Sequence, residues 1–122
     1  MKEVTVKELV TAFEGQLVKV ETPEHYGLII DMDKARIEYD EECNELSFTA
    51  GNYNHDGIAS IAVNVEDDIA SIEMDDEESD PVFVISFNEN MLSDIVITRF
   101  KTIEELENER KRRKRKNFDV VQ

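Results

Sequence analysis

Residues 69–87 read Ile69-Ala70-Ser71-Ile72-Glu73-Met74, Asp75-Asp76-Glu77-Glu78-Ser79-Asp80 and Pro81-Val82-Phe83-Val84-Ile85-Ser86-Phe87. The pattern predicts a strand, an acidic turn and a second strand. The second strand is almost wholly apolar, which is typical of a strand covered on both faces near the middle of a sheet. We therefore expect the core to form around residues 81–87.

Short alternating segments on both sides of this hairpin predict further strands. Ile37 and Tyr39, for example, alternate with charged residues, so that strand should have one solvent-facing side. Residues 56–61 resemble residues 67–72, which predicts two similar strands meeting across a turn at 66–68. The remaining predicted strands are residues 17–21, 27–32, 36–40, 45–49 and 95–100.

A helix is predicted at the N-terminal end of the chain, over residues 6–14. Thr5 and Glu8 have the spacing of a capping box, and Gly15 supplies the left-handed residue that commonly ends a helix. Its apolar stripe ends at Phe13, and packing of that stripe must hold so short a helix on the sheet. We expect Phe13, Phe83 and Ile85 to be buried.

A second helix is predicted from residue 102, because Thr102 and Glu105 form another possible capping box. Ile103 and Leu106 are expected to dock on the body. Beyond them the same face becomes cationic, so the helix should leave the body at Arg110. Seven consecutive bases form this basic tail: Arg110, Lys111, Arg112, Arg113, Lys114, Arg115 and Lys116.

These segments predict an α+β protein. Its sheet should be mostly antiparallel, a curled sheet or partly open barrel of about seven short strands, with an N-terminal helix packed on it and a C-terminal basic helix. We expect an acidic globular domain over residues 1–101, followed by a helix with the basic run and a short tail over residues 102–122.

The charges of the chain are unevenly distributed. It has 29 acids and 14 bases, a net charge of -15. Residues 1–100 hold 24 acids and 6 bases, a net charge of -18, whereas residues 101–122 hold 5 acids and 8 bases, a net charge of +3. Such a body repels nucleic acid and anionic membranes and attracts basic proteins. The competing interpretation is that the acids only keep the protein soluble.

The chain contains one cysteine, Cys43, so an intramolecular disulfide is ruled out and a reducing compartment is favoured. Its first residues lack the apolar segment of a secretory signal, and no window is apolar enough to span a membrane. We expect a cytoplasmic protein.

No motif in the chain identifies a reaction. His25 and His55 lie in separate predicted loops without a paired ligand, and residues 73–80 lack the ligand spacing and glycine of an EF-hand loop. A glycine-rich phosphate loop and a serine or cysteine nucleophile elbow are also missing. We expect a protein that binds without catalysing, with no metal and no cofactor; a small divergent enzyme is the third hypothesis.

Carboxylates recur at every second residue in two places, Glu38 to Glu42 and Glu73 to Glu77. In an extended chain such residues share one face at intervals of about 6.8 Å. Such a row resembles the phosphates of a nucleic-acid duplex at a lower charge density, because the duplex carries one negative charge per about 1.7 Å. Alternatively, these acids only protect exposed strands from aggregation. The predicted partner-binding residues are Glu38, Asp40, Glu42, Glu73, Asp75, Asp76, Glu77, Glu78 and Asp80.

The leading hypothesis is a nucleic-acid mimic that inhibits a basic nucleic-acid-binding protein, such as a restriction or CRISPR nuclease. Small acidic inhibitors from phages and mobile elements are similar in size and charge, which is a likeness of composition without a shared motif. The alternative is a nucleic-acid-associated structural or accessory protein of a phage or mobile element, which would bind through the basic tail. Both hypotheses are compatible with a homo-oligomer.

Overall fold

The computed structural model describes the backbone over residues 1–23, 30–52, 57–77, 80–88 and 93–121, and side chains over 1–23, 30–50, 60–77, 80–88 and 93–112. Two helices and eight strands occur in these ranges. In chain order they are β1 (Lys2–Glu3), α1 (Val6–Ala12), β2 (Val18–Glu21), β3 (Asp31–Asp40), β4 (Glu45–Asn52), β5 (Gly57–Asn64), β6 (Ile69–Asp75), β7 (Val82–Phe87), β8 (Ile95–Arg99) and α2 (Ile103–Val121).

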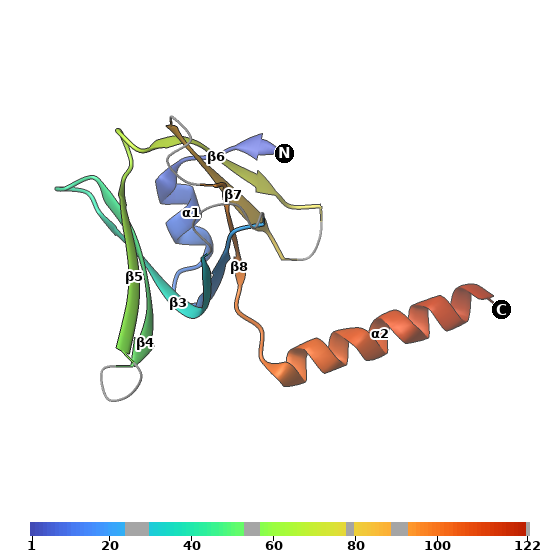
Figure 1. The fold of residues 1–122 in the computed structure, drawn as a ribbon. Coiled ribbons are helices and arrows are strands. Elements are labelled where there is room, and N and C mark those ends of the chain that lie inside the picture. Colours follow the sequence, from blue (N-terminus) through green and yellow to red (C-terminus); the bar gives the residue numbers. More distant parts are fainter. Residues whose placement is uncertain (24–29, 53–56, 78–79, 89–92, 122) are drawn as a thin grey trace.

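The strands form one sheet in the order β1-β6-β7-β8-β2-β3-β4-β5, and neighbouring strands are antiparallel. The sheet is open, with β1 at one end and β5 at the other. Figure 1 shows it curling around α1, which lies in the concavity. The predicted α+β class, antiparallel sheet and helix at each end are confirmed, although the described residues form eight strands where about seven were expected.

The start and end of α1 follow the predicted signals. The Glu8 backbone N–H donates to Thr5 Oγ1 over 3.2 Å, and Gly15, two residues beyond the C-cap Phe13, has a φ of 74°. The Phe13 ring meets the Phe83 ring edge to face, with centroids 5.3 Å apart. Phe13, Phe83 and Ile85 are all buried, as predicted. The helix therefore packs on the concave side of the sheet through aromatic and aliphatic side chains.

β7 is an interior strand, but only one of its faces is fully covered. Phe83 and Ile85 point into the core, whereas Val82 and Val84 on the outer face are half-buried. The prediction that both faces are covered is wrong because α1 occupies only the concave side of the sheet.

β3 joins what the sequence divides into separate strands at 27–32 and 36–40; of the first, residues 27–29 lie outside the described residues. Lys34 has a φ of 54° within the strand. Val18 pairs with Ala35 and Val20 with Met32, so β3 holds one extra residue, a β-bulge. The bulge bends β3 without ending it, so that β3 pairs with β2 first and with β4 beyond it.

β5 and β6 do not form the predicted hairpin. β5 pairs along its length with β4, whereas β6 pairs with β7 and β1 at the other end of the sheet. The corner between them redirects the chain: Asp68 Oδ2 accepts from the Asn64 N–H at 2.8 Å, and the Asn88 N–H donates to the Asp68 carbonyl at 2.8 Å. These bonds hold the corner in place and attach it to the end of β7. The corner thereby carries the chain from one end of the sheet to the other.

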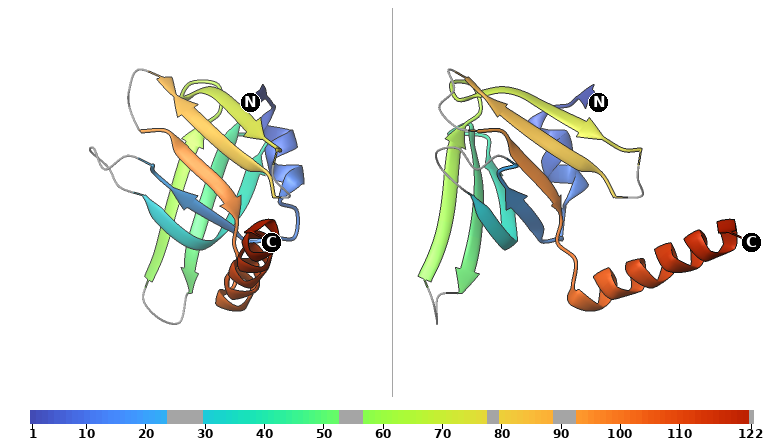
Figure 2. Two further views of the ribbon diagram at one scale, coloured as in Figure 1. Left: turned by 90° about the vertical axis from the view of Figure 1, so that its right-hand side faces the viewer. Right: turned by 45° about the vertical axis from the view of Figure 1, so that its right-hand side comes forward.

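α2 projects from the sheet as a rod, with its first turns near the end of β8 (Figures 1 and 2). It continues through the basic run to Val121. None of the helices in the described part of the chain is long and apolar enough to cross a membrane.

Candidate binding surfaces

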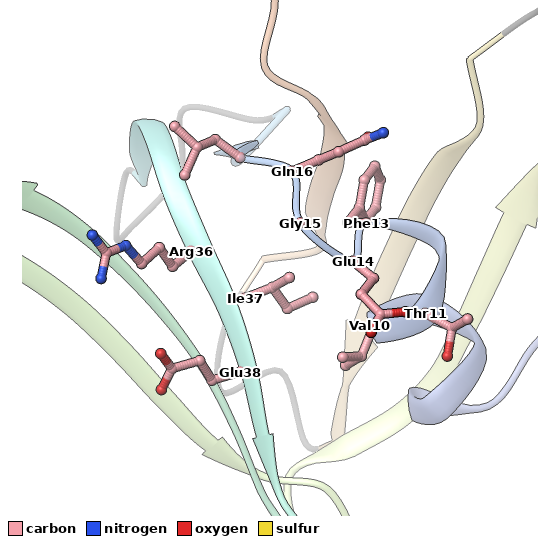
Figure 3. A pocket seen from close by; sticks show the side chains of 10 residues that line it. Val10, Thr11, Phe13, Glu14, Gly15, Gln16, Arg36, Ile37 and Glu38 are labelled. Atoms are coloured by element: carbon pink, nitrogen blue, oxygen red, sulfur yellow. The ribbon is translucent and has the colours of Figure 1, made fainter.

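The outer face of β3 carries the first predicted row of carboxylates. Ile37 points toward α1, while Arg36 and Glu38 point to the opposite side of the strand (Figure 3). Because side chains alternate along a strand, Asp40 shares the outer face with Glu38, and both are exposed.

The β3–β4 turn lies beside the β5–β6 corner, which brings two acidic segments together. Glu45 pairs with Asn64 across β4 and β5, and the Val65 N–H donates to the Asn44 carbonyl at 2.8 Å. We call the result the acidic end. It comprises six exposed residues: Asp40, Glu41, Glu42, Glu45, Glu66 and Asp67.

The negative charge of the acidic end shifts the pKa values of neighbouring groups. The charge of Asp40, and a hydrogen bond to that carboxylate, raise the pKa of the Cys43 thiol above its ordinary value, and Glu45 adds to this effect. The Lys7 ammonium lies 2.6 Å from Glu41, whose hydrogen bond and charge raise the pKa of Lys7. A negative potential therefore extends over these turns and favours a cation brought near them.

The second predicted row lies elsewhere. Asp76 and Glu77 are exposed on the β6–β7 turn, Glu73 and Asp75 on β6 are half-buried, and Glu78 lies outside the described residues. β6 is separated from β3 by β7, β8 and β2, and Figure 1 shows the two turns at opposite sides of the molecule. The two rows do not form one continuous face, so one flat partner surface cannot contact both.

Asp80, also predicted to bind a partner, forms ion pairs with the two cations that precede α2. Lys101 Nζ lies 2.9 Å from Asp80 Oδ2 and 2.5 Å from Glu109 Oε1. Arg99 lies 3.4 Å from Asp80 Oδ1 through Nε and 3.0 Å from Glu105 Oε2 through Nη1. We call these five residues the α2 clamp.

The α2 clamp corrects the prediction that Ile103 and Leu106 dock the helix. These side chains are 77% and 45% exposed. The Glu105 N–H donates to Thr102 Oγ1 at 3.2 Å, which caps α2 as predicted. Glu105 and Glu109, one helical turn apart, thereby face the two cations at the end of β8. The sequence signal for this contact was the alternation of Arg99 and Lys101 before two acids four residues apart.

The α2 clamp predicts a loss of stability in acid. A hydrogen bond from Lys101, together with the charges of Lys101 and Arg99, lowers the pKa of Asp80. Its contribution is therefore complete above the unfolded-state pKa, about 3.9, and is lost as the pH falls through the lower folded-state pKa. Because the side chain is partly exposed, we expect Asp80→Asn to cost about 1 kcal/mol at pH 7.

Urea unfolding of both proteins at pH 7 and near pH 2 would measure this effect. We expect the difference in unfolding free energy between wild type and Asp80→Asn to shrink as the pH falls. An equal difference at both pH values would show that the carboxylate charge of Asp80 does not stabilise the fold.

A hollow of about 660 Å³ is lined by Lys7, Tyr39 and three residues of the acidic end, Asp40, Glu41 and Glu42. Two others lie beside these surfaces. One, of about 470 Å³, lies between the end of α1 and β3 and is lined by Val10, Phe13 and Ile37 with Glu14 at its side (Figure 3). The other, of about 880 Å³, lies beside the start of α2. Neither lining contains histidine, cysteine or serine.

Two further sets of sequence candidates are only partly placed. His25 and His55 lie outside the described residues. Arg110, Lys111 and Arg112 of the basic tail are exposed on α2, and the side chains from residue 113 onward lie outside the described part. In the described ranges, no group of three or more His, Cys, Asp or Glu side chains is arranged to hold a metal ion.

Comparison of the chain with protein-family models, curated proteins and solved structures gives no match.

Proposed function

We propose that the protein binds the basic, nucleic-acid-binding groove of another protein and excludes the nucleic acid, as an acidic decoy. The acidic end is the contact surface. The observation that carries this proposal is the joining of the β3–β4 turn to the β5–β6 corner, which gathers six exposed carboxylates, of which Glu41 has an ion pair to Lys7 in the described structure. Nucleases such as restriction or CRISPR enzymes are the partner class that presents such a groove.

The charge distribution favours this function over simple solubility. Acids interspersed with bases would serve solubility as well, whereas an acidic cluster on a body of net charge -18 attracts a basic groove from a distance. Each exposed pair formed at the interface adds little, about 0.2 to 1 kcal/mol. Affinity must therefore be distributed over several carboxylates, and association should slow as salt rises.

A competition experiment tests the proposal. A panel of restriction and CRISPR nucleases would be incubated with a fluorescently labelled DNA duplex and increasing amounts of this protein. We expect displacement of the duplex from at least one nuclease, with an association rate that falls between low and physiological salt. A nuclease that binds this protein and the duplex together, without mutual exclusion, would contradict the decoy mechanism for that pair.

A second candidate function is attachment to nucleic acid through the basic tail. It is favoured by the projection of α2 away from the acidic body and by the exposure of Arg110, Lys111 and Arg112. Binding to phosphates would then weaken steeply with salt.

A further inference from the structure

We infer that α2 pairs antiparallel with α2 of a second copy of this chain, forming a symmetric dimer. The helix has 19 residues, so it is about 28 Å long. Figures 1 and 2 show only its first turns near the sheet. An isolated projecting helix gains little from packing, and a partner helix would supply the missing contacts.

The first apolar turn of α2 marks where the second copy docks. Ile103 is 77% and Leu106 45% exposed. Both line the 880 Å³ groove beside α2, together with Phe100 and Val82. The other apolar residues of α2 lie in its last turn, within 118–121. An antiparallel pair brings the last turn of each helix to the groove of its partner, so both apolar ends are covered at once.

The charges of α2 also favour the antiparallel pair. When Ile103 lies opposite Phe118 of the second copy, Glu107 lies opposite Lys114 and Glu104 lies near Arg115. The acidic first half of each helix then faces the basic second half of the other. A parallel pair would instead place acids beside acids and bases beside bases, which is destabilising.

This pairing leaves the α2 clamp intact. Ile103, Glu107 and Lys114 recur at helical spacing and share one face of α2. The clamp carboxylates, Glu105 and Glu109, lie on the other side of the helix, where they hold Arg99 and Lys101. The cost of the pairing falls at the two-fold axis, where Arg110 of each copy lies opposite Lys111 of the other; long side chains can turn their charges toward solvent there.

Charge-swap variants of the full chain test the inference. One variant is Glu104→Lys with Glu107→Lys, two exposed acids outside the α2 clamp; the other is Lys114→Glu with Arg115→Glu. We expect the wild type to sediment at twice the 14.1 kDa chain mass at low salt. Each variant alone should associate at least about tenfold more weakly, a change of about 1.4 kcal/mol.

An equimolar mixture of the two variants should restore the dimer, because each reversed half then faces its complement. Phe118→Ala should also weaken association, since Phe118 is the residue placed opposite Ile103. A wild type that stays monomeric at all concentrations, or variants that do not recover on mixing, would overturn the pairing. The pairing would also be overturned if both variants kept the mass of the wild type while Lys114→Glu/Arg115→Glu lost binding to a DNA duplex. That result would assign the basic tail to nucleic-acid binding.

Discussion

Replacing Phe83 by alanine is expected to lower the free energy of unfolding by about 3 to 5 kcal/mol, the usual cost of removing a buried phenylalanine ring. Phe83 is 1% exposed, and its ring packs edge to face on Phe13 of α1. The substitution therefore opens a cavity at the contact between the helix and the sheet. Chemical denaturation would measure the loss, with an unchanged denaturant slope indicating that the unfolded state is unaffected.

Val84→Ala is the matched control, because it shortens a side chain on the same strand. Val84 lies on the outer face and is only half-buried, so its loss should cost about 1 kcal/mol or less. Equal midpoints for Phe83→Ala and Val84→Ala would mean that the concave side of the sheet is not the core of this protein.

The local features of the fold could be predicted from the sequence because their causes are local. Thr5 caps α1, Gly15 takes the left-handed conformation after it, and the spacing of the apolar residues places Phe13 inside. Alternation likewise identified Ile37 as inward-facing and Glu38 as exposed. Each signal involves residues within a few positions of one another.

Which strands become neighbours could not be predicted in the same way. The similarity of residues 56–61 to 67–72 suggested a hairpin, but β6 crosses to the other end of the sheet. The acidic end depends on a bond between Asn44 and Val65, which are distant in sequence. No period of hydrophobicity marks such a contact, because hydrophobic pattern determines which face is buried and not which edge is paired.

The position of α2 was missed for a different reason. Hydrophobic pattern favoured docking through Ile103 and Leu106, whereas ion pairs from Arg99 and Lys101 to Glu105 and Glu109 hold the helix. Asp80 pairs with the same two cations. In an acidic chain with 6 bases among its first 100 residues, the partners of Arg99 and Lys101 could be any of many carboxylates. Only the folded backbone determines that their shared partner lies on the β6–β7 turn.

The acidic end is the proposed contact surface, and its charges can be removed without changing its shape. Glu42→Gln, Glu45→Gln and Glu66→Gln together neutralise three exposed carboxylates from its two turns. At about 0.2 to 1 kcal/mol per exposed pair, three pairs contribute about 0.6 to 3 kcal/mol, so the triple variant should bind its partner about threefold to 150-fold more weakly. Glu73→Gln, Asp75→Asn and Glu77→Gln make the same change of net charge on the opposite side of the molecule.

A nuclease-protection assay at physiological salt, on a nuclease that the wild type inhibits, separates the two sides directly. We expect the acidic-end triple to need at least about threefold more protein for half-maximal inhibition, while the β6–β7 triple stays close to wild type. If the acidic-end triple inhibits as well as wild type, or if both triples lose inhibition equally, the acidic end is not the contact surface and the claim is wrong.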